Sequence, residues 1–169
     1  MITLIYHGLD VNKEVLSNLL VGKRVVLPMV RKKYDLMHVA MTIMRHHRSP
    51  VALMYPEMGL HPKECLHVSD FLIRGKDRDI TVVSHSEHII LRVLRRVRQT
   101  MYDECESPNL KISPADISVR YVFDNDTSQY RPYERVNANG FTEFPILEDG
   151  GLDGYWPGGF FRERGDELF

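Results

Sequence analysis

The sequence predicts an α/β protein: a small parallel sheet with flanking helices, followed by a β-rich C-terminal element. One observation is that short apolar runs alternate with longer amphipathic segments between residues 34 and 102, as strands alternate with crossover helices in parallel sheets. Another is that alternating segments separated by turn residues replace this rhythm after residue 116. The length of 169 residues, with 43% hydrophobic and 27% charged residues, suits one globular domain with a small appendage.

The N-terminal part of the chain predicts strands and helices in alternation. Residues 2–6 form a short apolar run, and residues 11–20 have the spacing of a short helix. Residues 23–30 predict a second strand, and Pro28 favours an edge position or an early end of that strand because proline cannot donate to a strand ladder. Residues 34–47 predict a methionine-rich helix.

The middle of the chain continues this alternation. Residues 51–55 are an apolar run typical of a buried parallel strand, and Pro62 suits the first position of the helix that follows. Residues 79–83 predict the next strand, after which Ser84 and Glu87 have the spacing of a capping box at a helix start. The apolar faces expected for these two helices consist of Cys65, Val68, Phe71 and Leu72 in the first and of Ile89, Ile90, Val93, Leu94, Val97 and Met101 in the second.

The chain is expected to divide after the second of these helices. Residues 1–102 would form the α/β domain, and residues 103–116, which are polar and contain prolines, would be a linker. Residues 117–169 would form a small β-rich C-terminal domain, with strands expected at 117–123, 129–135 and 141–147.

Composition excludes several classes of protein. The formal net charge of −1 gives no overall field that would select nucleic acid or an anionic membrane. No apolar run approaches the roughly 20 residues that span a bilayer, so no membrane partner is expected. The cysteines, Cys65 and Cys105, make neither a disulfide framework nor a zinc quartet, and with the absence of signal-peptide features they predict a cytoplasmic protein. Zinc needs three or four convergent ligands, so no metal site is expected among His61, His67, His85 and His88.

Two polar sequences follow the predicted middle strands. The first is Tyr-Pro-Glu-Met-Gly-Leu-His-Pro at residues 55–62, and the second is Ser-His-Ser-Glu-His at residues 84–88. They resemble the end of the Walker B strand and the switch-histidine loop of ABC-type ATPases of the OLD and RecF groups. The matching residues are Pro56, Glu57, Leu60, His61 and Pro62 in the first motif and His85 and Ser86 in the second.

A third motif lies near the C-terminal end of the chain. Trp156-Pro157 is followed by Gly-Gly-Phe-Phe and acidic residues, which is similar to the end of a small C-terminal domain of unknown function in one subgroup of these ATPases. The resemblance covers about residues 32–169 and implies the C-terminal half of an ABC-type ATPase domain, with a partial ABC-ATPase-like parallel sheet. Trp156, Phe160 and Phe161 would hold the C-terminal segment on the domain, and a role as an aromatic anchor for a partner protein is also open.

Departures from the family pattern decide what the resemblance implies for activity. The chain has no phosphate loop of the form G-x-x-x-x-G-K-[ST], because Gly22-Lys23 lacks the loop length and the hydroxyl. Met54 and Tyr55 occupy the two positions where the family carries acidic residues for Mg²⁺ and water. The family's signature segment would fall near residues 31–35, where Arg-Lys-Lys-Tyr-Asp lacks the usual Gly and Ser donors.

The chain is therefore not expected to hydrolyse ATP by itself, and no catalytic residue is expected. Glu57 and His85 would remain as remnants of the hydrolytic site, with His85 and Ser86 as candidate nucleotide contacts. ATP and Mg²⁺ would bind only if a partner chain completed the site. A structural interpretation is also open, in which His85 serves packing or capping and Glu57 accepts hydrogen bonds from loop amides.

Three functions stay open at this point. The leading hypothesis is a catalytically inactive, ATPase-derived binding or regulatory protein that docks on a larger protein complex, such as a related defence or DNA-repair ATPase. One alternative is a nucleotide-binding ATPase subunit completed by a partner chain. The other is a nucleic-acid-binding module, in which Arg92, Arg95 and Arg96 would contact phosphates, although a solvated helix face explains these arginines equally well.

Overall fold

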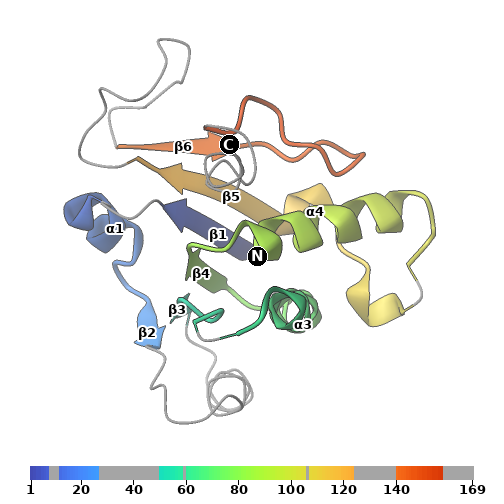
Figure 1. Ribbon diagram of the computed structural model, residues 1–169, viewed down its shortest axis with the longest axis horizontal. Helices are drawn as coiled ribbons and strands as arrows, with labels where there is room; N and C mark the ends of the chain where they lie inside the picture. Colours follow the sequence, from blue (N-terminus) through green and yellow to red (C-terminus); the bar gives the residue numbers. More distant parts are fainter. Residues whose placement is uncertain (8–11, 27–49, 59, 106, 124–139, 158–169) are drawn as a thin grey trace, which may run out of the picture.

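The structure, a computed structural model, describes residues 1–7, 12–26, 50–58, 60–105, 107–123 and 140–157. Within these residues six strands form one sheet in the order β2-β3-β4-β1-β5-β6, and every neighbouring pair is parallel except β5 and β6 (Figure 1). The chain is therefore an α/β protein, as its sequence predicted. Some predicted features lie outside the described residues, namely the helix at 34–47, the strand at 129–135, the segment at 31–35, and Phe160 with Phe161.

The central strand of the sheet is β1 (Ile2–His7). It pairs with β4 (Ile80–Ser84) on one side and with β5 (Ile117–Val122) on the other. Five of its six residues are buried, as expected for a strand with neighbours on both sides. The family resemblance begins only near residue 32, so the strand that organises the sheet comes from a region about which the resemblance made no prediction.

The other strands of the parallel half run toward the edge formed by β2 (Arg24–Val26). This is the outermost described strand on its side, in agreement with the predicted edge position, and residues 27–30 of the predicted strand lie outside the described residues. β3 (Val51–Met54) lies between β2 and β4, and every residue of β3 and β4 is buried. Continuous burial is the pattern of parallel strands that are covered on both faces.

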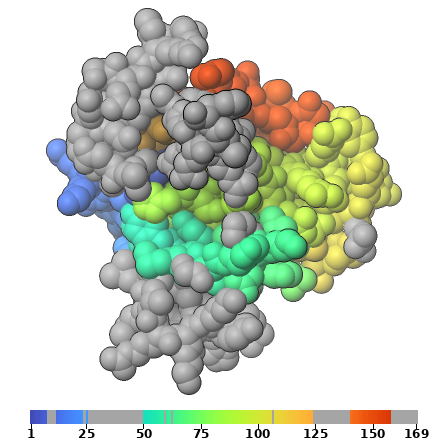
Figure 2. Space-filling model, in the orientation of Figure 1, coloured from blue at the N-terminus to red at the C-terminus, as the bar shows by residue number. Residues whose placement is uncertain are grey.

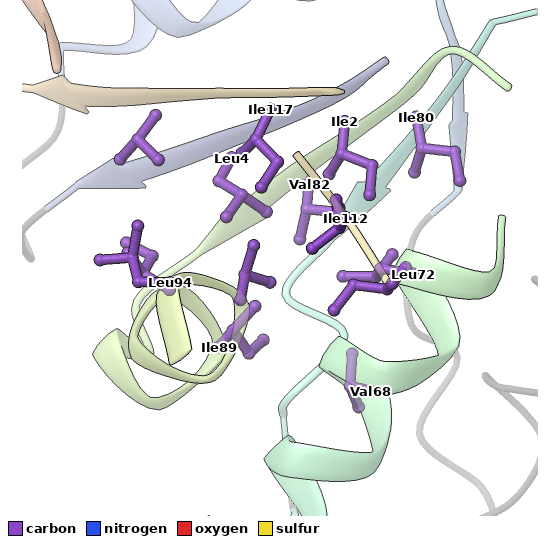
Figure 3. Close-up of a cluster of buried hydrophobic side chains, with 14 of the residues drawn as sticks. Ile2, Leu4, Val68, Leu72, Ile80, Val82, Ile89, Leu94, Ile112 and Ile117 are labelled. Atoms are coloured by element: carbon purple, nitrogen blue, oxygen red, sulfur yellow. The ribbon is translucent and has the colours of Figure 1, made fainter. Parts of the chain in front are cut away.

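Helices cover both faces of the sheet. α3 (Pro62–Arg74) and α4 (Glu87–Met101) pack against each other on one face, and α1 (Lys13–Leu19) lies on the other. Side chains alternate along a strand, so Leu4 packs beneath α3 and α4 while its neighbour Ile5 packs with α1. The core beneath α3 and α4 includes Ile2, Val68, Leu72, Ile80, Val82, Ile89, Ile112 and Ile117 (Figure 3).

Two expectations about α4 are wrong, one at each end of the helix. The N-cap is Ser86, and Ser84 is the last residue of β4, so the capping box predicted for Ser84 and Glu87 does not form. The physical reason is that pairing with β1 continues through Ser84, which keeps that residue extended. At the other end Met101 is 50% exposed, because the buried face of the helix ends at Val97.

The segment predicted as a linker packs against the same core. It contains two short 3₁₀ helices, Pro108–Leu110 and Pro114–Asp116, and Leu110 and Ile112 are buried. β5 then extends the sheet, and β6 (Phe141–Phe144) pairs with it in antiparallel orientation. Strands from both sides of the predicted domain boundary therefore belong to one sheet, because β5 completes the pairing of β1.

Trp156 anchors the segment that follows β6. Its side chain is 4% exposed, and its ring centroid lies 5.3 Å from Tyr6, 5.2 Å from Tyr121 and 5.3 Å from Phe144. Its Nε1–H donates to the Glu87 carboxylate at the start of α4 over 3.0 Å. Trp156 thus fixes the C-terminal segment to both the sheet and α4, as its sequence motif predicted.

Gly150 lets the loop after β6 touch α4. Its φ is 81°, and a Cβ at this position would lie 2.5 Å from the Leu94 carbonyl oxygen and 3.1 Å from the Arg98 backbone nitrogen. We predict that Gly150→Ala lowers the free energy of unfolding by about 2–4 kcal/mol, because the methyl group adds left-handed strain and a clash with helix backbone.

The matched control for this prediction is Gly22→Ala. Gly22 has a similar φ of 76°, but a Cβ there would meet nothing within 4 Å, so this substitution isolates the backbone strain of about 1–2 kcal/mol. Urea denaturation measures both losses. Equal losses for the two variants would contradict a clash at Gly150.

Candidate functional site

Polar residues gather where three neighbouring parallel strands end. His7 is the last residue of β1, Tyr55 and Glu57 follow β3, and His85 follows β4. We call these four residues the strand-end cluster. The chain leaves β1 toward α1 on one face and leaves β4 toward α4 on the other, so the connections of these adjacent strands diverge here. Such a switch point, at the carboxyl edge of the sheet, is where α/β proteins bind ligands.

The ring of His85 has a defined orientation. Its Nδ1 lies 3.1 Å from the carbonyl oxygen of His7, which can only accept, so Nδ1 carries the hydrogen. Tyr55 stacks on the ring, with 4.7 Å between centroids and 3° between planes, and the His7 ring meets it edge-on at 4.2 Å. His85 is nevertheless exposed to solvent. In the neutral ring the lone pair therefore lies on Nε2, which is the atom of His85 that can bind a ligand.

Tyr55 holds the stacked arrangement together. Its backbone N–H donates to the Val83 carbonyl over 2.7 Å, and its hydroxyl lies 2.9 Å from Nε2 of His7. Its φ of 50° is in the left-handed region, which is strained for a side chain of this size. Burial and, to a smaller extent, the Glu57 carboxylate raise the pKa of Tyr55 above its usual 10.0, so the phenol stays neutral.

Glu57 fastens the turn between β4 and α4. Its Oε1 accepts from the Ser84 hydroxyl over 2.8 Å and from the His85 backbone N–H over 2.8 Å. The Ser84 hydroxyl in turn accepts from the Ser86 backbone N–H over 2.8 Å. These contacts agree with the interpretation of Glu57 as an acceptor for loop amides. Its Oε2 is buried and has no hydrogen-bond partner among the residues that the structure describes.

Sequence reasoning missed two residues of this region. His7 lay outside every motif, and it meets His85 only because β1 and β4 are neighbours in the sheet. Cys65 was expected only as a core residue, yet its thiol lies near Ser86 and Glu57. Burial raises the pKa of the Cys65 thiol, a hydrogen bond with Ser86 opposes this increase, and Glu57 adds to it. The net increase keeps Cys65 protonated, which argues against a reactive thiolate.

Met54 and Tyr55 occupy the two positions where the ABC-type family carries acidic residues, so neither position provides a carboxylate in this chain. Met54 is 8% exposed and packs in an apolar cluster with Ile5, Leu16 and Val83. Tyr55, at the second position, stacks on His85 instead. Within the described part of the chain, no group of three or more His, Cys, Asp or Glu side chains could hold a metal ion.

His61 has a structural role at the start of α3. Its Nδ1 accepts from the Lys63 backbone N–H over 3.2 Å, and its own backbone N–H donates to Glu64 over 2.9 Å. These reciprocal bonds form a capping box, with Pro62 at the first helical position. The Leu-His-Pro motif is therefore explained locally as the beginning of a helix.

The three arginines proposed as a nucleic-acid contact do not form one exposed face. Arg92 and Arg96 both make paired hydrogen bonds to the Asp70 carboxylate on α3, at distances of 2.8 to 3.1 Å. Arg96 is also buried, with 8% exposure. Arg95 is exposed and remains available for a partner. Sequence periodicity alone could not reveal this separation, because the carboxylate comes from another helix.

The glycine-lysine pair is not part of a phosphate-binding loop. Gly22 and Lys23 lie in the turn before the edge strand β2, and Lys23 pairs with Asp79 over 3.6 Å. Nucleotide-binding α/β folds carry their glycine-rich loop after the first strand. The sequence that follows β1 is Gly-Leu-Asp-Val at residues 8–11, which has neither the glycines nor the lysine of such a loop.

Comparisons with models of protein families, with curated proteins and with solved structures gave no match. No helix in the portion that the structure describes combines the length and the apolar character needed to cross a membrane.

Proposed function

We propose that this chain is an ATPase-derived binding or regulatory protein that does not hydrolyse ATP by itself and acts by docking on a larger protein complex. A related defence or DNA-repair ATPase is the kind of complex that its family resemblance favours. The proposal combines the resemblance at residues 55–62 and 84–88 with the altered chemistry of the strand-end cluster.

The observation that carries the proposal is the pair of side chains at the end of β3. Hydrolysis of ATP by a Walker-type site needs a carboxylate on Mg²⁺ and a second carboxylate near the attacking water. Met54 and Tyr55 occupy these two positions, and neither side chain has a carboxylate. Met54 is buried among apolar side chains, and Tyr55 stacks on His85. Glu57 is the acidic residue that remains, and its Oε1 already accepts from Ser84 and from the His85 amide.

The retained geometry supports descent from a working site. Glu57, Ser84 and Ser86, which lie in or beside the two matching motifs, fix the turn in front of α4. A chain can keep such contacts because they stabilise the fold, after the residues specific to hydrolysis have been replaced.

A partner-completed nucleotide site is the second candidate function. The observation that favours it is the exposed Nε2 of His85, in a ring whose orientation is set by Tyr55 and His7. A neighbouring ATPase that supplied the phosphate loop and the carboxylates could use this nitrogen as a hydrogen-bonding group toward a phosphate. In that case the isolated chain would bind nucleotide weakly and its partner would bind it tightly.

Calorimetric titration of the full chain with ATP, with and without Mg²⁺, tests the proposal. We expect no Mg²⁺-dependent binding tighter than a Kd of about 1 mM, because the sequence has no phosphate loop and the described strand ends carry no carboxylate pair for Mg²⁺. His85→Gln and Glu57→Gln serve as paired variants. Tight Mg²⁺-dependent binding by the isolated wild-type chain that both variants abolish would overturn the proposal and favour a nucleotide-binding subunit.

A further inference from the structure

The imidazole of His85 is exposed to solvent, yet three contacts fix its position. Its Nδ1–H donates to the His7 carbonyl oxygen over 3.1 Å, and the His85 backbone N–H donates to Glu57 over 2.8 Å. The Tyr55 ring lies parallel to the imidazole, with 3° between the two planes. A ring that is already held in this way loses little conformational freedom when a ligand contacts it, so it is preorganised for binding.

The ring contacts of His85 leave one of its two faces open. Tyr55 covers one face, with 4.7 Å between the centroids. The His7 centroid lies 4.2 Å from His85 and 5.6 Å from Tyr55. If His7 covered the opposite face, its distance from Tyr55 would be close to the sum of the two contacts with His85, so His7 lies beside the imidazole instead. Among the described ring contacts, none is therefore made by the face of His85 that points away from Tyr55.

Tyr55 is held behind His85 in a backbone conformation that costs free energy. Its φ of 50° is rare for a bulky side chain, whereas Asp103, the other described non-glycine residue with a positive φ, is of a type that tolerates it. The Tyr55 N–H donates to Val83, its carbonyl accepts from Met58, and its hydroxyl bonds to His7. Residues kept in strained conformations by such contacts are concentrated at functional sites, where the strain helps to build the site.

The open face of His85 lies where α/β proteins bind ligands, at the carboxyl edge of the sheet beside the switch point between β1 and β4. In Figure 2 the teal surface of the segment after β3 adjoins the yellow-green surface at the start of α4, so both segments reach the outside of the molecule. Stacking needs a flat ring and access from solvent, and it does not need an enclosed cavity. The position therefore suits a ligand that binds through a planar ring.

The groups around His85 favour a planar ring with polar edges. The nearby charged groups are the carboxylates of Glu57, which contacts the His85 N–H, and Glu87, at the start of α4. An anionic group would gain no attraction from them unless a partner chain supplied cations. Ser84 and Ser86 flank His85 in the chain and offer little apolar surface to an aromatic side chain of a partner. Nucleobases combine an aromatic face with polar edges, and they stack on histidine and tyrosine rings.

We propose that the open face of His85 is a stacking platform for a nucleobase, and that Tyr55 supports the imidazole from behind. This inference goes beyond the docking function, because it concerns a base and requires neither phosphates nor Mg²⁺. The ATP titration with and without Mg²⁺ and the adenosine experiment below can therefore fail separately.

The test is a titration of the full chain with adenosine, which has a base but no phosphate. Saturation-transfer NMR, observed on the adenosine protons, measures the affinity. We expect saturable binding with a Kd in the millimolar range, because a single stacking contact carries it. In spectra of the protein, the imidazole protons of His85 are expected to move upfield, since they come to lie over the face of the purine.

Two substitutions separate stacking from hydrogen bonding by the ring nitrogens. His85→Phe keeps a flat ring that can stack on Tyr55, so its affinity for adenosine should stay within about threefold of the wild type. His85→Ala removes the ring and should weaken binding at least about fivefold. The matched control is His67→Ala, at an exposed position of α3 where no described ring stacks on the histidine, and it should change the affinity by less than about twofold.

The source of the base is distinguished with a tetradeoxyadenylate. Affinity equal to that of adenosine assigns the platform to a free nucleotide, and a gain of more than about tenfold assigns it to single-stranded nucleic acid, because several bases then contribute. Absence of saturable adenosine binding, or an equal loss in His85→Phe and His85→Ala, would overturn the proposal. Tighter binding of inorganic tripolyphosphate or of N-acetyltryptophanamide than of adenosine would also overturn it, in favour of an anion or of a partner's aromatic side chain.

Discussion

Replacement of Trp156 by alanine is expected to lower the free energy of unfolding by about 3–5 kcal/mol. The indole is buried between Tyr6, Tyr121 and Phe144, so its removal would leave a large cavity between the sheet and the C-terminal segment. The substitution also removes the indole N–H that donates a hydrogen bond to the Glu87 carboxylate.

Far-ultraviolet circular dichroism in a urea titration is the suitable measurement for this change. Trp156 is the only tryptophan of the chain, so intrinsic indole fluorescence would disappear with the substitution. Trp156→Phe is the control, because it keeps an aromatic ring but has no N–H for Glu87, and its loss should be about half as large. A loss below about 1 kcal/mol in the alanine variant would show that the C-terminal segment does not stabilise the fold.

Asp70→Asn is expected to destabilise the protein by about 2–3 kcal/mol, since it removes the carboxylate that joins α3 to α4. The Asp70 side chain is 16% exposed and accepts from both Arg92 and Arg96, whose side chains are 18% and 10% exposed. Without the carboxylate, two nearly buried guanidinium groups would share a neutral amide. Asp77→Asn, at an exposed position in the turn after α3, is the matched control and should change stability by less than about 0.5 kcal/mol.

The same carboxylate makes stability depend on acid pH. Burial alone would raise the pKa of Asp70, but hydrogen bonds and charges of Arg96 and Arg92 lower it from 3.8 to about 2. Because the folded-state pKa is the lower one, the contribution is complete above about pH 4 and disappears as the pH falls toward 2. It amounts to about 1–2 kcal/mol after allowance for partial solvent screening. Urea titrations at pH 5 and pH 2.5 should therefore differ less in Asp70→Asn than in the wild type, and an unchanged difference would argue against this role.

Local sequence patterns predicted the individual elements well. Pro62 marked the first residue of α3, and three of the four residues expected on its apolar face, Cys65, Val68 and Leu72, are buried. Four of the five residues in the apolar run at 51–55 form the fully buried strand β3, which ends at Met54. These features depend on residues close in the chain, so their spacing alone carries the information.

Features that depend on distant residues could not be predicted in the same way. His7 contacts His85 only because β1 pairs with β4, and no motif in the sequence around His7 predicts this pairing. Arg96 has the polarity of an exposed residue, yet it is buried because Asp70 on another helix lies beside it. A domain boundary was predicted at 103–116 because the composition of this segment is polar. The composition could not show that Leu110 and Ile112 are buried there, or that strands on both sides of the segment belong to one sheet.

The position of β1 has a consequence for the order in which the protein assembles during synthesis. Ile2 leaves the ribosome well before its two pairing partners, Ile80 and Ile117. A sheet whose first-made strand lies at its centre cannot close until most of the chain has been translated, because contacts so far apart in sequence form late. During that interval the apolar β1 segment has two unpaired edges that could join another chain.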